Sequence, residues 1–445
     1  MVNSSSSNKR SWHQLAIISG LLAFGATTGS LFLHNRATSQ ATLTPLVAPL
    51  PQDPHIQVFF NQAESAIYTE PYRGLTRYGD DLERVIIEAI AQATTSVDVA
   101  VQELNLPSVA EALAKSQRRG VSVRLILEND YSTPEADNRE ALEIIQAAKV
   151  PQIDDTADGS RGSGLMHHKF VVIDNRLVIT GSANFTYSGV HGDADDLSSR
   201  GNANALLKIA DEAVAAQFTE EFNLMWGDGP NKNLDSQFGL QKPLRPTYST
   251  LLPNSRVTLK FSPVSATHPW SQSTNGLIAE ILARSQRSIK AALFVFSEQQ
   301  LANQLETQVS RGTRLQALID PGFAYRSYSE ALDMLGIVIP DHRCKVEAKN
   351  KLWTSPIFSV GIPNLPTGDK LHHKFAVIDD STVVIGSHNW SHAANTNNDE
   401  TLLVIESATV AAHFNREFER LYKEADLGET SLLTKKKEEG QQRCP

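Results

Sequence analysis

Positive charge and cysteine are both scarce in this chain of 445 residues. Lysine and arginine number 41 against 50 aspartate and glutamate residues, which gives a net charge of −9. No overall basic field attracts nucleic acid, which weakens a nuclease function without excluding it, because a local patch can differ. Only two cysteines occur, Cys344 and Cys444, so a disulfide framework is not expected and we interpret both as incidental. At 41% hydrophobic and 20% charged residues, the composition is that of a globular protein.

Long hydrophobic runs are also lacking, except for one near the N-terminus. Lys9 and Arg10 precede an uncharged run over residues 15–33. As a helix, this run spans about the ~30 Å thickness of a bilayer's hydrocarbon core. We therefore predict that residues 1–40 are a signal peptide or a membrane anchor, with the body of the protein outside the cytoplasm. The proline-rich residues 41–54 are expected to be a spacer.

One motif occurs twice. The sequence reads MHHKFVVIDNRLVITGSANFT from Met166 and LHHKFAVIDDSTVVIGSHNWS from Leu371. In both copies a His is followed by Lys, then by Asp, then by Gly-Ser-x-Asn. The repeated residues are His167, Lys169, Asp174, Gly181, Ser182 and Asn184, and His372, Lys374, Asp379, Gly386, Ser387 and Asn389. Two copies in the same register are a strong signal of an internal repeat.

The start of each copy is short, apolar and β-branched, which predicts a buried strand. Side chains alternate along a strand, so His167 and Lys169 share one face, whereas His168 and Asp174 lie on the other. A lysine beside a histidine disfavours a metal ion and suits an anion, with histidine as nucleophile or proton carrier. By the same alternation, the aspartate should support the strand instead of touching substrate. Two such half-sites indicate a phosphoryl site.

The Gly-Ser-x-Asn segment ends the next predicted strand. Its hydroxyl and amide groups can bind an anion, and its glycine permits close approach of the backbone. We therefore predict that Ser182, Asn184, Ser387 and Asn389 bind substrate.

These strings resemble the paired H-x-K-x-x-x-x-D motifs of the phospholipase D superfamily. The resemblance extends from about His55 to about Ala425. It implies an α/β fold of two tandem repeats, each a mixed sheet flanked by helices, packed as a pseudo-twofold pair with one shared active site. It also implies a two-step phosphodiester exchange through a phosphohistidine, without metal or cofactor. The resemblance assigns the catalytic residues as His167, Lys169, Asp174, His372, Lys374 and Asp379.

The repeats set the expected domain boundaries. Repeat 1 covers residues 55–230, a linker covers 231–255 and repeat 2 covers 256–425. The polar tail, residues 426–445, is expected to be disordered. Repeat 2 carries additional apolar residues within Cys344–Asp369, which either line a substrate mouth or form a packing flap.

The ends of the two repeats differ at one aligned position. Asn204 of repeat 1 aligns with Glu400 of repeat 2. Members of the superfamily resemble the second copy, with an acidic residue that hydrogen-bonds a catalytic histidine of the opposite repeat. The resemblance therefore implies that Glu400 orients His167 and that Asn204 orients His372. On this basis His167 is the expected nucleophile and His372 the general acid.

Three activities are compatible with this site. A phospholipase D-type lipid phosphodiesterase is favoured by the N-terminal segment, which would contact the membrane, and by the acidic charge. A metal-independent endonuclease of the same superfamily is the alternative, because the GSANFT ending is similar to that of compact superfamily nucleases. A phosphatidyltransferase lies between the two. We expect a monomer that acts on a phospholipid or another phosphodiester.

Overall fold

The motif of each repeat lies at the centre of its own β-sheet. The structure, a computed structural model, describes residues 43–159 and 164–444. The sheet of repeat 1 has the strand order β1-β9-β8-β7-β4-β5-β6. Strands β4, β5 and β6 are parallel and the other neighbours are antiparallel, so the sheet is mixed. Its strands are β1 (Ile56–Phe60), β4 (Ser96–Val101), β5 (Ser122–Leu127), β6 (Gln152–Asp154), β7 (Lys169–Ile173), β8 (Leu177–Gly181) and β9 (Ala205–Ala210).

Repeat 2 has the same arrangement with one added strand at each edge. Its order is β10-β11-β19-β17-β16-β12-β14-β15-β20, and its central seven strands correspond one by one to those of repeat 1. The motif strand β16 therefore occupies the place of β7. The strands are β10 (Tyr248–Leu252), β11 (Ser255–Ser262), β12 (Ser288–Leu293), β14 (Arg314–Ile319), β15 (Val360–Ile362), β16 (Lys374–Ile378), β17 (Thr382–Gly386), β19 (Glu400–Glu406) and β20 (Asp426–Leu427).

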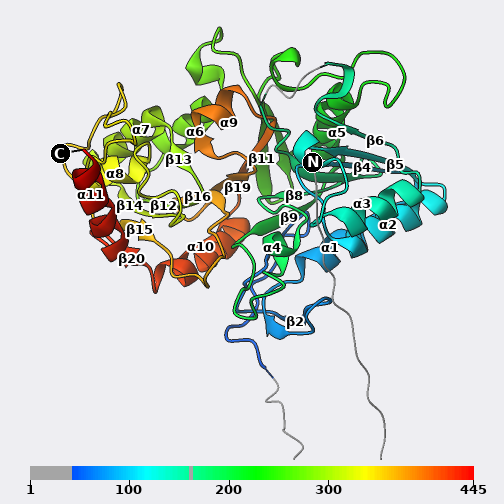
Figure 1. Ribbon diagram of the computed structural model, residues 1–445, viewed down its shortest axis with the longest axis horizontal. Coiled ribbons are helices and arrows are strands. Elements are labelled where there is room, and N and C mark those ends of the chain that lie inside the picture. Colours follow the sequence, from blue (N-terminus) through cyan, green and yellow to red (C-terminus); the bar gives the residue numbers. More distant parts are fainter. Residues whose placement is uncertain (1–42, 160–163, 445) are drawn as a thin grey trace, which may run out of the picture. The chain divides into compact units, whose positions relative to one another are not determined.

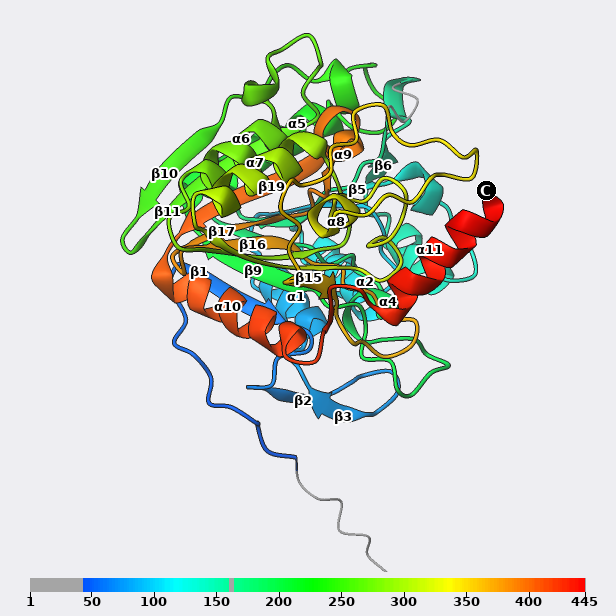
Figure 2. The ribbon, with the colours of Figure 1, turned by 90° about the vertical axis from the view of Figure 1, so that its left-hand side faces the viewer.

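Helices cover both faces of each sheet because the strands are apolar on both sides. Along β7, Val171 and Ile173 pack in one core, whereas Phe170 and Val172 pack in another. Figures 1 and 2 show the helices around the two sheets. The helices are α1 (Leu82–Ala91), α2 (Pro107–Arg118), α3 (Arg139–Ala147) and α5 (Glu212–Trp226) in repeat 1, and α6 (Thr274–Ala283), α7 (Gln299–Ser310), α8 (Glu330–Leu335) and α10 (Ala408–Tyr422) in repeat 2. The smaller elements are β2 (Ile67–Thr69), β3 (Thr76–Tyr78), β13 (Phe296–Ser297), β18 (Trp390–Ser391), α4 (Tyr187–Val190) and α9 (His392–Thr396).

The two repeats share their largest hydrophobic core. This core contains Phe170 and Phe375 of the two motif strands and the phenylalanines of α5 and α10. Together with the matching strand orders, this confirms the predicted pair of α/β repeats. A hydrophobic core continuous across the repeats fixes their relative position, because separating them would expose these side chains to water.

Reciprocal backbone hydrogen bonds also join the repeats. The amide of His167 donates to the carbonyl of Asp399 at 3.0 Å, and the amide of His372 donates to the carbonyl of Ala203 at 3.1 Å. Each motif histidine is thus held by the segment that precedes β9 or β19 of the opposite repeat. The backbone hydrogen bonds of the motif segment in each repeat therefore require the other repeat.

The predicted linker, residues 231–255, contains more structure than expected. Its residues Tyr248–Leu252 form β10, which pairs with β11 at the edge of the second sheet. Lys242 is buried between the carboxylates of Glu221 and Asp399. The segment therefore belongs in part to the folded body, because these ion pairs satisfy a buried ammonium group.

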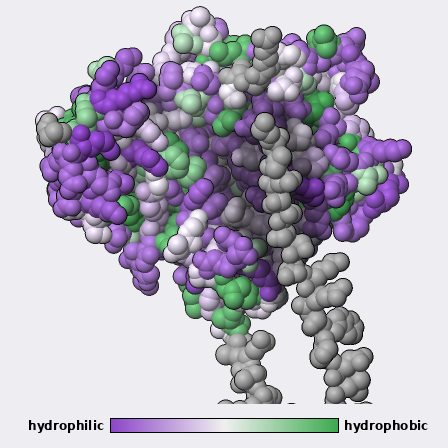
Figure 3. All heavy atoms as spheres, viewed as in Figure 1, coloured by the Kyte–Doolittle hydropathy of each residue, from purple (hydrophilic) through white to green (hydrophobic). Residues whose placement is uncertain are grey.

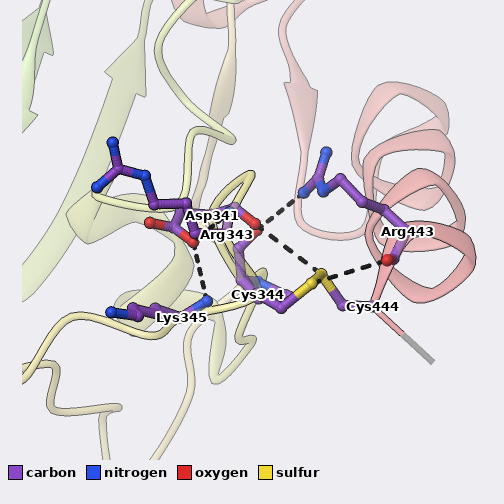
Figure 4. The surroundings of a disulfide bond; sticks show 7 residues. Asp341, Arg343, Cys344, Lys345, Arg443 and Cys444 are labelled. Atoms are coloured by element: carbon purple, nitrogen blue, oxygen red, sulfur yellow. Dashed lines mark hydrogen bonds between the residues drawn. A yellow bond between two sulfur atoms is a disulfide. The ribbon is translucent and has the colours of Figure 1, made fainter.

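The prediction of a disordered tail is wrong for residues 426–444. Asp426–Leu427 forms β20, and Ser431–Arg443 forms helix α11, which buries Leu433. The prediction that the cysteines are incidental is also wrong, because Cys344 and Cys444 form a disulfide (Figure 4). Beside it, the Arg443 guanidinium donates to the carbonyl of Pro340 at 3.0 Å. The disulfide thus ties the end of α11 to the loop that follows α8.

That loop overlaps Cys344–Asp369, the segment for which the sequence allowed two roles, a substrate mouth or a packing flap. Trp353 is buried, and its amide donates to the carbonyl of Asp333 in α8. The amide of Ile357 likewise donates to Met334. Phe358, in contrast, is 63% exposed. The part near Trp353 is therefore a packing flap over α8.

The predicted signal peptide or anchor lies outside the described residues. Among the helices of residues 43–159 and 164–444, none has the length and apolar character needed to cross a bilayer. The surface seen in Figure 3 is mainly hydrophilic, with hydrophobic groups scattered over it.

Candidate active site

The two motif histidines and lysines lie in one buried site between the repeats. His167 is 6% exposed and His372 is 8% exposed, while Lys169 and Lys374 are each 1% exposed. The four groups interact electrostatically, since both lysine charges lower the pKa of each histidine. The predicted single site at the repeat interface is thus present in the structure.

Each histidine is held through Nδ1 by a side chain of the opposite repeat. His167 Nδ1 donates to Glu400 Oε2 at 2.7 Å, and His372 Nδ1 lies 3.0 Å from Asn204 Oδ1. The cross-repeat contacts expected from the sequence are therefore confirmed. Both contacts leave Nε2 of the imidazole to face the substrate, as a nucleophile or a proton carrier.

The amide of Asn204 has a fixed orientation. Its Nδ2 donates to the carbonyl of Gly189 at 2.8 Å, so its Oδ1 must face His372. Glu400 is fully buried and also accepts a hydrogen bond from Ser387 Oγ at 2.6 Å. Burial raises the pKa of Glu400, while His388 and Lys169 lower it. The two histidines consequently face different partners, a carboxyl group and a neutral amide.

Ser182 and Ser387 do not bind substrate as predicted. Both are fully buried, and their hydroxyls donate to Asn204 Oδ1 and Glu400 Oε2, respectively. Each hydroxyl also accepts the amide hydrogen of the residue that follows the orienting side chain. The serines therefore position the groups that hold the histidines. The preceding glycines are required by space, since a Cβ on Gly181 would collide with the carbonyl oxygen of Ala205.

The asparagines of the motif remain suited to substrate. Asn184 and Asn389 are only partly buried, and the Oδ1 atom of each has no hydrogen-bond partner among the described residues. Asn184 Nδ2 lies 3.3 Å from Gln102 Oε1, which also accepts from Lys169 Nζ at 3.3 Å. An amide oxygen only accepts hydrogen bonds, so each asparagine would bind a phosphoryl oxygen through its Nδ2 donor.

The aspartates of the motif are not at the site. Although burial opposes its charge, hydrogen bonds from Ser96, Thr95 and Thr94 hold the pKa of Asp174 below its usual range. Asp379 accepts the equivalent hydrogen bonds from residues 286–288. The assignment of these aspartates to the catalytic set is therefore wrong, and the strand-supporting role expected from alternation is confirmed. They join the end of each motif strand to the loop before β4 or β12.

The second histidine of each motif also points away from the site, as alternation predicted. His168 Nε2 lies 3.3 Å from Glu221, and His373 Nε2 lies 2.9 Å from Glu417. All four groups are buried. These histidines pack behind the motif strands and have hydrogen-bonding partners there, as buried polar groups require.

The lysine ammonium groups are the strongest electrostatic feature of the site. Lys169 Nζ donates to its own motif's His167 carbonyl at 2.8 Å, and Lys374 Nζ donates to the His372 carbonyl at 2.7 Å. Within the described part of the chain, neither has an ion-pair partner within 4 Å. Burial lowers the pKa of Lys169 to about 7, and burial together with the charge of Lys169 lowers the pKa of Lys374. An anion between them would stabilise both charges.

Two carboxyl groups that were not predicted support the site. Glu128 Oε2 accepts the amide hydrogen of Met166 at 2.6 Å, and Asp320 Oδ2 accepts that of Leu371 at 2.8 Å. Burial raises the pKa of Glu128 to about 8 and also raises that of Asp320. Glu128 directly follows β5 and Asp320 directly follows β14, the equivalent strand. The alignment of the two repeats could therefore have identified this pair of acidic residues. They fix the residue in front of each motif histidine, His167 or His372.

Metal coordination is not evident. Residues 43–159 and 164–444 contain no group of three His, Cys, Asp or Glu side chains arranged to hold a metal ion. Metal independence stays a prediction.

The family model for "Cardiolipin synthase, PLD-like domain" matches residues 86–226 and 278–422, which cover more than half of the chain and both motifs. The chain belongs to the phospholipase D family.

Individual relatives match about a third of the chain. A mitochondrial cardiolipin hydrolase of Xenopus tropicalis is 28% identical over 160 residues, which cover 36% of this chain and 65% of the relative. A phospholipase D of Rickettsia prowazekii is 27% identical over 158 residues, with the same coverage of both chains. These alignments thus span less than two thirds of each relative's length. The fold is also similar to that of a phosphatidylserine synthase of Haemophilus influenzae. The match covers 85% of this chain and 88% of the synthase, with a TM-score of 0.57 and 13% identity.

Exchanging the two orienting side chains should change the two histidines differently. Glu400→Gln keeps the hydrogen bond but removes the carboxylate from His167, so we expect kcat to fall by about 10²–10⁴-fold. Asn204→Asp places a carboxylate on His372 and should raise its pKa. The alkaline limb of kcat against pH should then move to higher pH. A wild-type rate in Glu400→Gln would contradict the role of the carboxylate.

Anion binding should weaken as Lys169 loses its proton. A lysine whose pKa is about 7 is charged below that pH and neutral above it. The inhibition constant of dimethyl phosphate, which stays a monoanion in the neutral range, should therefore rise above pH of about 7. Lys169→Arg serves as the matched variant, because a guanidinium keeps its charge. An inhibition constant that is equally independent of pH in both proteins would contradict this expectation.

Proposed function

We propose that this protein is a phospholipase D-type lipid phosphodiesterase that hydrolyses or transfers a phospholipid phosphodiester through a phosphohistidine. The observation that carries the proposal is the pair of buried ammonium groups without ion-pair partners, flanked by two histidines held through Nδ1. The phosphoryl oxygens would occupy the space between the lysines. Asn184 and Asn389 would hydrogen-bond the same oxygens.

In the first step, His167 Nε2 attacks phosphorus. Glu400 at Nδ1 stabilises the positive charge that grows on this ring as it attacks. His372 Nε2 gives its proton to the leaving alcohol oxygen. Burial and the lysine charges lower the pKa of His372 in the empty site. A bound phosphoryl anion offsets the lysine charges and raises this pKa, so that His372 can hold the proton that it donates.

In the second step, water or an acceptor alcohol attacks the phosphohistidine. His372, now neutral, takes the proton of the attacking oxygen. The nitrogen–phosphorus bond breaks, and His167 returns to its starting state. Attack by water is hydrolysis, and attack by an alcohol is transfer.

Three observations support a lipid over a nucleic acid. The net charge of −9 does not attract a polyanion. The relatives from Xenopus tropicalis and Rickettsia prowazekii carry names of lipid-directed enzymes. The hydrophobic run at residues 15–33 would keep the enzyme at a membrane. The GSANFT ending favours the endonuclease as the second candidate.

We place the enzyme outside the cytoplasm as part of this proposal. The lysine and arginine before the hydrophobic run favour this orientation. The disulfide between Cys344 and Cys444 gives independent support, since structural disulfides persist mainly in oxidising compartments.

The substrate class can be tested directly. Purified protein should release the head-group alcohol from phosphatidylglycerol vesicles in the presence of EDTA, and should not cleave single-stranded DNA under the same conditions. His167→Ala and His372→Ala controls exclude a contaminating enzyme. Cleavage of DNA without turnover of lipid would favour the endonuclease, and restoration of a lost activity by a divalent ion would contradict metal independence.

The roles of the histidines can be separated with an activated substrate. A p-nitrophenyl phosphodiester needs little help from an acid, so His372→Ala should still form a covalent phosphohistidine. His167→Ala should form none. The intermediate is measured by peptide mapping after an acid-free quench. A phosphoryl group mapped to His372 would reverse the assignment.

A further inference from the structure

Two phenylalanine rings border the proposed proton donor. The Phe294 ring centroid lies 4.8 Å from that of His372, and the Phe323 centroid lies 4.7 Å from that of Phe294. Both phenylalanines are only partly buried. Their rings therefore have surface available beside the active-site histidine.

The position of repeat 1 that is equivalent to Phe294 is polar. Val101 pairs with Lys169 and Leu293 pairs with Lys374, so the next residues, Gln102 and Phe294, are equivalent. Gln102 Oε1 accepts hydrogen bonds from Lys169 and Asn184.

Phe323 has an aromatic counterpart that carries a hydroxyl. It lies three residues after Asp320, as Tyr131 lies three residues after Glu128, and Asp320 and Glu128 support the site in the same way. The repeats therefore differ mainly at Phe294, where only repeat 2 places an aromatic ring beside its motif histidine.

The reaction geometry places one part of the substrate beside this ring. A proton donor must lie about 2.6–3.2 Å from the leaving oxygen, so the first carbons of the leaving alcohol must lie close to the His372 ring. Phe294 is in contact with that ring. Lys374 Nζ lies 4.9 Å from the Phe294 centroid, and this charge repels a cationic group.

We propose that Phe294 and Phe323 form the binding subsite for the leaving alcohol and select a neutral, apolar alcohol over a cationic or highly polar one. This inference rests on the proposed function, in which His372 protonates the leaving oxygen. Attack by His167 forms the nitrogen–phosphorus bond while the bond to the leaving oxygen breaks, and the proton of His372 moves to that oxygen. In reverse, an acceptor alcohol occupies the same subsite, gives its proton to His372 and takes the phosphoryl group from His167.

Competition between acceptor alcohols measures the subsite independently of the total rate. The full-length protein is incubated in detergent micelles with a phosphatidyl p-nitrophenyl diester as donor, whose leaving group is aromatic and carries no net charge before it departs, and with equal concentrations of 1-butanol and deuterated glycerol. Mass spectrometry then gives the ratio of phosphatidylbutanol to deuterated phosphatidylglycerol. We expect the wild-type protein to favour butanol, and Phe294→Gln to lower the ratio by about tenfold.

Matched variants separate binding from packing. Phe294→Leu stays apolar and should keep the ratio within about twofold of wild type. Phe358→Gln makes the same chemical change at an exposed loop position and should leave the ratio unchanged. Equal losses in Phe294→Gln and Phe294→Leu would show that the ring only supports His372, which overturns the proposal.

If Phe294→Gln is inactive, the subsite can be tested at Phe323 instead. Phe323→Gln removes the outer ring, which contacts Phe294, and should also lower the ratio. Turnover of lipid by the wild type with an unchanged ratio in this variant would overturn the inference alone. Absence of lipid turnover by the wild type would overturn the proposed function and the inference with it.

Discussion

Repulsion between two buried ammonium groups is the constraint on which this site depends. Lys169 and Lys374 are almost completely buried. Burial lowers the pKa of both, the charge of Lys169 also lowers the pKa of Lys374, and both lysine charges lower the pKa of each motif histidine. Like charges in such an environment are unfavourable until an anion lies between them. The protein tolerates them because the motif strands are fixed by a core that both repeats share. Stability in the surrounding fold thus maintains a local arrangement that is suited to a phosphate group.

The pseudo-twofold symmetry of the fold contrasts with the chemistry of its site. Strand order, motif spacing, the buried serines and the carboxyl groups of Glu128 and Asp320 are all repeated. The group on each histidine is not repeated, since one is Glu400 and the other is Asn204. A reaction that needs one nucleophile and one proton donor benefits from such a difference. Symmetric folding and asymmetric chemistry are compatible because the side chains that face the site can differ while the strands that carry them keep their matching positions.

Much of this arrangement could be predicted because it depends on local periodicity. Alternation along the motif strand correctly separated His167 and Lys169 from His168 and Asp174, and the repeat alignment paired Asn204 with Glu400. Ser182 was misassigned because sequence does not show that its hydroxyl turns toward Asn204 and not toward substrate. The pairing of Cys344 with Cys444 was missed because these residues are 100 positions apart and meet only through the packing of α11. Contacts of this kind depend on tertiary structure, which the periodicity of the sequence does not reveal.

The reciprocal bonds between the repeats also bear on when the enzyme becomes active during its synthesis. His167 and its partner Glu400 are separated by 233 residues. A growing chain that has completed only the first repeat contains His167 but not Glu400. It also contains Ala203 but not Leu371, the residue with which Ala203 pairs. The ribosome must add nearly all of the second repeat before a competent site can assemble. An enzyme built in this way is inert toward the phosphodiesters around it for most of its translation, with no separate inhibitory segment needed.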